Sequence, residues 1–306
     1  MEVDVLIPVY RPDGKLTELL KRLKMQNYPI HRVILMNTEE KHFPAELTGI
    51  WDRVEVYHLA KEEFDHGGTR DRGVRMSTAD LVLCMTQDAM PADETLIEEL
   101  MKPFDDPEVW AAYARQLPNE DCREVEKYTR SFNYPEQSMV KTKEDLDRLG
   151  IKTFFCSNVC AAWRREKYLE LGGFVKHTIF NEDMILAGTM IKQGGKIAYC
   201  AKAKVIHSHN YSAFQQFHRN FDLAVSQTMY PEAFGGIRSE SEGIKLVKKS
   251  LSYCIKIGKP WLMIQVVTQS AGKLLGYKMG QRYRSLPMWL ILRCTMSPSF
   301  WRGGKA

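Results

Sequence analysis

Three acidic residues of this chain stand where sequence patterns place chemistry. Asp88 lies directly beyond the apolar run 81–85, and Glu182 and Asp183 stand side by side at the start of a segment with helical periodicity. A carboxylate can hold a divalent cation on a phosphate group, or it can accept the proton of a substrate hydroxyl. Structural alternatives remain open, because Asp88 can begin a turn or cap a helix over 93–102, and acids favour helix N-termini.

Two histidines and a glycine-rich segment add further candidate ligands. His207 and His209 follow an apolar run, and an imidazole can share a cation with a carboxylate. The segment 64–73 reads FDHGGTRDRG and opens a predicted helix, so its backbone amides and Arg70 suit a phosphate or nucleotide. It is not GxGxxG, and the chain has no P-loop lysine motif, which argues against dinucleotide oxidoreductases and P-loop NTPases. The alternatives are surface histidines and a tight turn with a charged helix start.

These residues must be positioned by alternating strands and helices. Short apolar runs bounded by turn residues predict strands, and apolar residues at helical spacing predict helices. The alternation indicates an α/β fold with a doubly wound, mostly parallel central sheet flanked by helices, which binds ligands at the carboxyl ends of its strands. The predicted strands cover 3–8, 32–36, 54–59, 81–85, 110–115 and 197–206, and the predicted helices cover 16–23, 69–77, 93–102, 164–171 and 182–193.

The charge is distributed unevenly along the chain. From Gly243 to the last residue there are twelve Lys and Arg and no Asp or Glu, whereas the first 242 residues hold 31 Lys and Arg against 38 Asp and Glu. Within this basic region, 244–257 has the pattern of a basic amphipathic helix, with Trp261, Trp289 and Trp301 beyond it. We therefore predict one domain over 1–235 and a basic helical C-terminal region over 236–306.

The remaining bulk features point to the cytoplasm. The N-terminus begins MEVDVLIPVY, with acids where a signal peptide needs basic residues. No stretch approaches the roughly 18 apolar residues of a spanning helix. The seven cysteines are scattered and show no zinc-type spacing, so we expect free thiols.

Several segments in a consistent order resemble family 2 glycosyltransferases of the GT-A fold, and within them the bacterial rhamnosyltransferases. Together they span about residues 3–225, and the order is more specific than any single motif. The segments are VLIPVYRP at 5–12, FDHGGTRDRG at 64–73, MTQDAMP at 85–91, ARQLP at 114–118, RSFNYPEQS at 130–138, FFCSNVCAAWRREKYLELGGF at 154–174, NEDM at 181–184 and VIHSHNYS at 205–212.

This resemblance implies a Rossmann-like sheet and a role for each polar residue. The family's Asp-any-Asp motif is reduced here to Thr86-Gln87-Asp88, so Asp88 would hold Mg²⁺ or Mn²⁺ with His207 or His209 as a further ligand. Asp183 would be the general base, and Glu182 would orient the acceptor or a loop; two adjacent acids are expected to raise one another's pKa.

The resemblance also implies residues for binding donor and acceptor. Asn37 and Thr38 would join the nucleotide site at their strand end, and Gln116 would help contact sugar hydroxyls. A core role for Trp163 is the alternative to an acceptor role. The implied nucleotide-sugar residues are Pro8, Tyr10, Glu39, His66, Thr69, Arg70, Gln87 and Arg115, and the implied acceptor residues are Asn158 and Trp163.

The expected function is an inverting, metal-dependent transfer of L-rhamnose from dTDP-L-rhamnose to a hydroxyl of a lipid-linked glycan in bacterial cell-surface polysaccharide synthesis. A related transferase using a UDP-hexose or UDP-N-acetylhexosamine is one alternative. A non-catalytic membrane-bound scaffold in polysaccharide assembly is another.

The basic region has its own set of interpretations. Amphipathic helices commonly pack on their own domain, and no nucleic-acid-binding module accompanies the charge. Lysine and arginine with tryptophan suit an anionic membrane surface. We therefore expect a cytoplasmic protein that is peripheral on the inner face of the plasma membrane and binds no nucleic acid.

Overall fold

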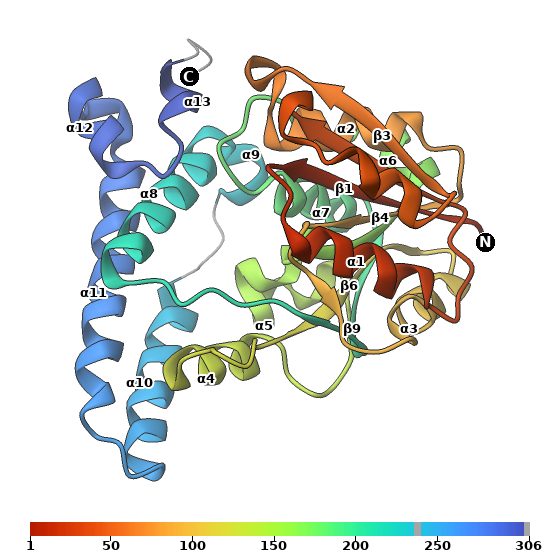
Figure 1. Ribbon diagram of the computed structural model, residues 1–306. Helices are drawn as coiled ribbons and strands as arrows, with labels where there is room; N and C mark the ends of the chain where they lie inside the picture. The colour runs from red at the N-terminus through yellow and green to blue at the C-terminus, as the bar shows by residue number, and fades with distance from the viewer. Residues whose placement is uncertain (236–239, 303–306) are drawn as a thin grey trace. The chain divides into compact units, whose positions relative to one another are not determined.

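The chain divides into two compact units, each described here by itself. The computed structural model describes residues 1–235 and 240–302 (Figure 1). The first, called the α/β unit, is made of Met1–Asn119, Tyr134–Lys176 and Glu182–His207. The second, called the helical unit, is made of Glu120–Asn133, His177–Asn181 and the chain from Ser208 onward. None of these boundaries falls at residue 235, the end of the domain predicted from the sequence.

The α/β unit is built on one nine-stranded sheet in the order β3-β2-β1-β4-β8-β6-β9-β5, with β7 paired to β9. Strands β1 to β4, β6 and β9 run in one direction, and β8 runs against them between β4 and β6. The predicted mostly parallel α/β sheet is therefore confirmed. The strands are β1 (Val3–Tyr10), β2 (Arg32–Thr38), β3 (Val54–Leu59), β4 (Leu81–Met85), β5 (Met90–Pro91), β6 (Val109–Leu117), β7 (Met139–Lys141), β8 (Cys160–Arg164) and β9 (Lys196–Ile206).

Helices cover both faces of this sheet because alternate strand residues point to opposite sides. On one face, Val5 and Ile7 of β1 join the leucines of α1 and α3 in the main hydrophobic cluster. On the other face, α2 approaches β1 so closely that a Cβ at Gly73 would lie 2.3 Å from Leu6. The helices of this unit are α1 (Gly14–Lys24), α2 (His66–Met76), α3 (Leu96–Met101), α5 (Leu146–Leu149), α6 (Arg165–Glu170) and α7 (Glu182–Lys192).

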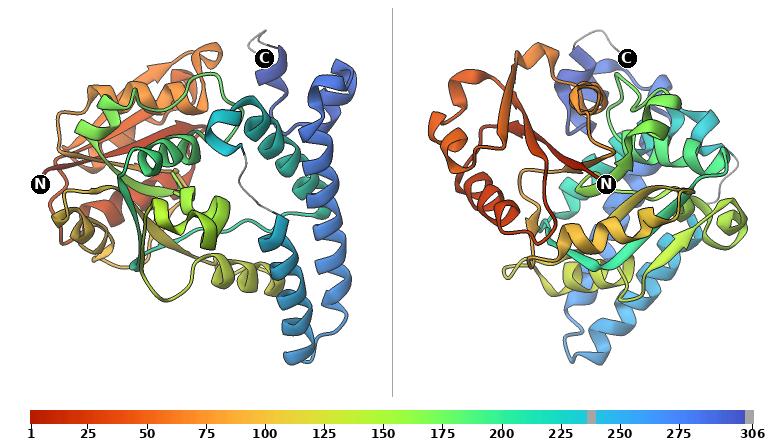
Figure 2. Two further views of the ribbon diagram at one scale, coloured as in Figure 1. Left: turned by 180° about the vertical axis from the view of Figure 1, so that it is seen from behind. Right: turned by 90° about the vertical axis from the view of Figure 1, so that its right-hand side faces the viewer.

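The helical unit gathers three separate parts of the sequence. In it α8 packs along α11, and α10 and α11 lie side by side as an antiparallel pair, which Figure 2 shows from two further directions. Its helices are α4 (Glu124–Asn133), α8 (Ala213–Met229), α9 (Pro231–Phe234), α10 (Glu240–Lys256), α11 (Leu262–Gln281), α12 (Met288–Cys294) and α13 (Pro298–Arg302).

The amphipathic helix expected over 244–257 is present as α10, and its apolar face is buried inside the helical unit. Val247, Leu251 and Cys254 of that face pack against Val125 and Val266 of neighbouring helices. Ile244, one turn before Val247, is exposed instead. The lysines of α10 therefore remain on the surface while most of its apolar side chains stabilise the unit.

Candidate functional site

The polar residues predicted to bind a ligand lie at the carboxyl ends of neighbouring parallel strands. Tyr10 ends β1, and Gln87 follows β4, which is hydrogen-bonded to β1. The Tyr10 amide donates to Oε1 of Gln87 at 3.0 Å, and Nε2 of Gln87 donates to the Tyr10 carbonyl at 3.2 Å. Gln87 thus joins two strand ends, so its amide is placed to shape the binding edge.

The end of β2 presents buried polar atoms that are unusual for a protein interior. Nδ2 of Asn37 donates to Nδ1 of His58 on β3 at 2.9 Å. This bond fixes the amide and leaves Oδ1 of Asn37 buried; within the described residues it has no hydrogen-bond partner, and neither has Oγ1 of Thr38. Buried polar atoms are normally paired, so such atoms at a strand end indicate a ligand site. His58 was not predicted from the sequence, because its role depends on the pairing of β3 with β2.

The backbone at this edge is strained in two places. Arg11, just beyond β1, has φ 45°, and Glu39, just beyond β2, has φ 64°. Residues other than glycine seldom adopt such values, and they gather at binding sites where the surroundings enforce them. The carboxylate of Glu39 pairs with Lys41 at 2.9 Å, and this hydrogen bond lowers the pKa of Glu39.

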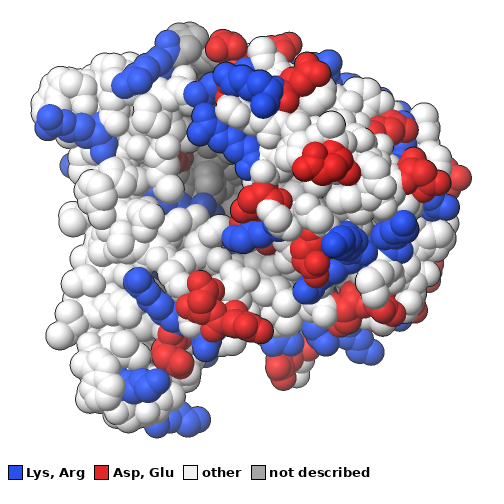
Figure 3. Space-filling model, viewed as in Figure 1, with Lys and Arg blue, Asp and Glu red and all other residues white. Residues whose placement is uncertain are grey.

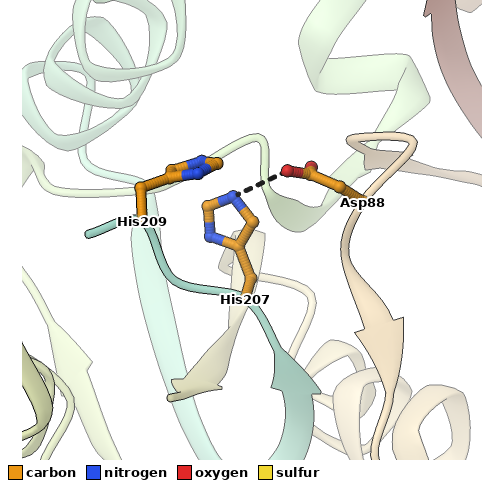
Figure 4. Close-up of side chains that lie close together, drawn as sticks. All are labelled: Asp88, His207 and His209. Carbon is orange, nitrogen blue, oxygen red and sulfur yellow. Dashed lines mark ion pairs between the residues drawn. The ribbon is translucent and has the colours of Figure 1, made fainter. Parts of the chain in front are cut away.

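Asp88 lies opposite a histidine that is oriented by a buried glutamine. Nε2 of His207 is 3.6 Å from Oδ2 of Asp88 (Figure 4). On the far side of the ring, Nδ1 of His207 is 3.1 Å from Oε1 of Gln116, which in turn donates from Nε2 to Ser157. Because an amide oxygen only accepts, Nδ1 of His207 carries a proton, and a neutral ring then has its lone pair on Nε2, the nitrogen that faces Asp88.

The arrangement fits a divalent cation. One ligand atom from each of Asp88, His207 and His209 lies within 4.8 Å of the others. A carboxylate oxygen and two imidazole nitrogens leave open positions for phosphate oxygens and water. The helix-cap alternative for Asp88 does not apply, because α3 begins at Leu96 with Thr95 before it.

Glu182 and Asp183, called here the acid pair, begin α7 and are held by Asn158. The backbone N–H of Asn158 donates to Oδ2 of Asp183 at 3.0 Å, and the side-chain Nδ2 of Asn158 donates to Oε1 of Glu182 at 3.3 Å. Asn158 stands just before β8, which is antiparallel, so the start of β8 lies at the same edge as the end of β4. The reversed strand is what brings Asn158 to the acids.

The pKa values of the two acids are shifted in opposite directions. Burial disfavours the charge on both, but Nη1 of Arg70 lies 3.1 Å from Oε1 of Glu182, so the pKa of Glu182 is lowered. Burial, together with the charge of Glu182, raises the pKa of Asp183 to about 7. Our expectation that the acids raise one another's pKa is therefore wrong for Glu182, because the neighbouring positive charge of Arg70 favours its ionised carboxylate. Asp183 is poised to exchange a proton near neutral pH.

Trp163 lies beneath this assembly. Its side chain is 0% exposed, and its Nε1 donates to Oδ1 of Asn158 at 3.0 Å. Since an indole N–H only donates, it sets the Asn158 amide with Nδ2 towards Glu182. An acceptor sugar has no surface of Trp163 to contact, so the core alternative describes its place, and Asn158 is buried as well.

The glycine-rich segment forms the start of α2 next to the acid pair. Asp65 accepts from the Gly68 amide at 2.6 Å, and the Thr69 hydroxyl accepts from the Asp65 amide at 3.2 Å. A Cβ at Gly67 would lie 1.9 Å from the Val175 carbonyl oxygen, so only glycine fits there. His66 is exposed at this helix start.

Several predicted residues thus have protein partners that differ from the expected ligand. Thr69 is buried and serves the helix start, and Arg70 pairs with Glu182 rather than standing open for a diphosphate. Gln116 is buried against His207, so it positions that ring instead of reaching sugar hydroxyls. Arg115 pairs with Glu136 at 3.1 Å, and Pro8 lies partly buried in β1.

The acid pair also lies close to β4, the strand that precedes Asp88. Burial raises the pKa of Cys84 on β4 to about 12, and the charges of Arg70 and the acid pair also act on this thiol. Asp88, which follows β4, and the proton-exchanging carboxylate therefore lie at one edge of the α/β unit. All seven cysteines are free, as expected from their spacing, and all are buried.

Comparison with known proteins gives three kinds of similarity. A model of the family described as glycosyl transferase family 2 matches residues 4–172. O-antigen chain rhamnosyltransferase RfbN of Salmonella typhimurium is 37% identical over 305 residues, 98% of this chain and 96% of that protein. O-antigen chain rhamnosyltransferase WbaN of Salmonella anatum is 40% identical over 247 residues, 79% of this chain and 78% of that protein.

A solved structure shares the architecture. Mannosyltransferase PcManGT from Pyrobaculum calidifontis, in complex with GDP-Man and Mn²⁺, aligns with a TM-score of 0.57 over 99% of this chain and 84% of that one. At 15% identity this similarity shows the fold alone, which is the GT-A fold.

Proposed function

Because this chain belongs to glycosyl transferase family 2, we propose that it transfers L-rhamnose from dTDP-L-rhamnose to a hydroxyl group of a glycan acceptor. The observation that carries the chemistry is the acid pair, in which one carboxylate stays ionised and its neighbour has a pKa of about 7. The sugar is supported by the two relatives, both of which are named O-antigen chain rhamnosyltransferases.

Asp183 is the proposed general base. The acceptor hydroxyl oxygen attacks the anomeric carbon, its proton passes to a carboxylate oxygen of Asp183, and the bond to the diphosphate breaks with its electron pair on the leaving oxygen. A base with a pKa near the working pH suits this transfer. A single displacement inverts the anomeric carbon, so a β-linked donor gives an α-L-rhamnoside.

Glu182 is proposed to stay ionised and to tune the pKa of Asp183 rather than to exchange protons itself. Its negative charge, held by Arg70 and Asn158, raises the proton affinity of Asp183. Asn158 and Trp163 act as positioning residues, because they fix the carboxylates without reaching the solvent.

Asp88, His207 and His209 would hold a divalent cation, which would supply positive charge beside the departing diphosphate. Mg²⁺ prefers an all-oxygen shell, so two imidazole nitrogens lead us to propose Mn²⁺ as the tighter-binding ion. Gln116 orients His207 for this purpose. Tyr10, Asn37, Glu39 and Gln87 are proposed to receive the nucleoside at the ends of β1, β2 and β4.

The product is proposed to be a cell-surface polysaccharide, built on a lipid-linked acceptor at the inner face of the cytoplasmic membrane. The basic region 236–306 is the proposed means of attachment, because beyond Glu242 it holds twelve Lys and Arg and no acid. Among the described residues, no helix is long and apolar enough to cross a membrane.

A donor panel tests the proposal directly. Purified protein is incubated with dTDP-rhamnose, UDP-glucose, UDP-galactose or UDP-GlcNAc, with Mn²⁺ or Mg²⁺ or with EDTA, and the released nucleotide is measured. We expect release from dTDP-rhamnose with metal and none with EDTA. Preference for a UDP-sugar would replace the donor and keep the enzyme class. No release from any nucleotide sugar would favour the scaffold alternative.

A further inference from the structure

The exposed apolar side chains of the helical unit form a stripe along α11. Trp261 at the helix start is 62% exposed and Ile264 is 71% exposed. At 100° per residue the stripe occupies one side of the helix, and from residue 261 to 275 it runs for about 20 Å at 1.5 Å per residue. We call this set the α11 stripe; its members are Trp261, Ile264, Val267, Leu274 and Leu275.

The opposite side of α11 is occupied by a close helix contact. A Cβ at Gly272, Gly276 or Gly280 would lie 2.4, 2.1 or 2.3 Å from a backbone oxygen of α8. Larger residues at these three positions would force the helices apart, so α11 cannot turn about its axis to hide the stripe. The stripe therefore faces outward because the glycines hold the other side.

The stripe side chains are exposed, so they do not take part in the packing of the helical unit. The apolar face of α10 already packs with Val266 on another side of α11. In Figure 3 the surface over α11 is white along most of its length. Trp289 on α12 adds a second exposed tryptophan, 61% exposed. An exposed apolar set of this size marks an interaction surface.

Charge decides between a lipid surface and a second copy of the chain. Exposed lysines of α10 precede the stripe in the sequence, and the exposed arginines 282, 284 and 293 follow it. Residues 243–302 contain no acidic residue that could pair with these charges across an interface between two copies. Two such surfaces repel one another, whereas anionic headgroups attract this one.

We propose that the α11 stripe inserts into the headgroup region of an anionic lipid bilayer, with α11 lying along the surface and the basic side chains contacting the headgroups. An interfacial helix buries its apolar side only partway into the bilayer. The proposal deepens the membrane association proposed above, and it does not depend on the identity of the donor sugar.

Vesicle flotation of the full-length protein tests this surface. The vesicles contain either phosphatidylethanolamine with phosphatidylglycerol, or phosphatidylcholine alone. We expect wild-type protein to float with the anionic vesicles and much less with the neutral ones. The double variant Ile264→Gln with Leu275→Gln is expected to bind at least about tenfold more weakly, since each change removes apolar area that the bilayer would bury. Lys248→Glu with Lys249→Glu is expected to weaken binding at low salt.

Met25→Gln is the matched control, because Met25 is 60% exposed on the α/β unit, and it should bind as wild type does. Release of nucleotide from a soluble donor, measured without lipid, shows whether each variant keeps a working α/β unit. The proposal is overturned if wild type ignores anionic vesicles, or if the stripe variant binds them normally. It is also overturned if lipid-free wild type sediments as a dimer that the stripe variant dissociates, since the stripe then joins two copies.

Discussion

The acid pair and the Asp88 position contain the same carboxylate chemistry in two different settings. Asp183 is partly buried, accepts backbone hydrogen bonds from Asn158 and Met184, and has a pKa of about 7. Asp88 is partly exposed at a strand end, and its Oδ2 lies 3.6 Å from Nε2 of His207. Burial beside another acid favours holding a proton, whereas access to solvent beside an imidazole lone pair favours holding a cation.

Asp183→Asn should have the largest effect, because it removes the proton acceptor and nearly preserves the shape. We expect kcat to fall by about 10²- to 10⁴-fold with little change in KM, measured by nucleotide release with acceptor present. Asp147→Asn, an exposed acid of the same unit, is the control and should be silent. Retained turnover in Asp183→Asn would assign the proton to another group.

Asp88→Ala tests the other half of the comparison. The metal concentration needed for half-maximal activity should rise by about 10²-fold or more, because the only carboxylate of the set is gone. The measurement is a Mn²⁺ titration of activity together with Mn²⁺ binding to the protein alone. Asp93→Asn, exposed and nearby in sequence, should titrate as wild type. Unchanged Mn²⁺ binding in Asp88→Ala would remove Asp88 from the cation site.

Gln116→Leu should weaken the cation site by about 10- to 100-fold, since the partner that fixes the His207 ring is lost. Gln116→Glu keeps an acceptor and should retain most of the affinity. Mn²⁺ binding is again the readout, and Gln193→Leu, at an exposed residue just beyond α7, is a control for the substitution itself. Equal losses in Leu and Glu variants would mean that Gln116 acts through packing alone.

The rate at saturating metal should depend on pH through Asp183. Its pKa is raised to about 7, so the base is protonated below that value and ionised above it. The rate should therefore fall about tenfold per pH unit below pH 7 and level off above it. The residual activity of Asp183→Asn should lack this acid limb. A midpoint near pH 4 would show that the carboxylate is not held as described.

Trp163→Phe should have the smallest effect, because it keeps the aromatic packing and removes one hydrogen bond to Asn158. With the amide free to turn its oxygen towards Glu182, we expect kcat to fall by about three- to tenfold, since a lost buried hydrogen bond costs about 1 kcal/mol. The midpoint of the pH profile should also move up by about half a unit. Trp110→Phe on β6 is the matched control. A fall in kcat with an unmoved midpoint would indicate a packing role only.

Much of the fold was predictable because its signals are local. The strands at 54–59 and 81–85 were predicted with the observed bounds, and the helix from Glu182 with an end one residue away. Apolar runs and helical spacing depend on near neighbours in the chain. The reversed direction of β8 was not predicted, because a short apolar strand reads the same whichever way it runs in the sheet.

The sequence by itself identified the acids, the histidines and the ordered motifs of a family 2 glycosyltransferase, since residue type and order persist in any arrangement of the chain. Only the tertiary structure decided that Asp183 rather than Glu182 carries the raised pKa, because the deciding neighbours, Arg70 and Asn158, come from distant segments. It likewise buried Trp163 and left α11 with an exposed apolar side. Ionisation and exposure depend on what surrounds a side chain in space, and that is fixed only when the chain is folded.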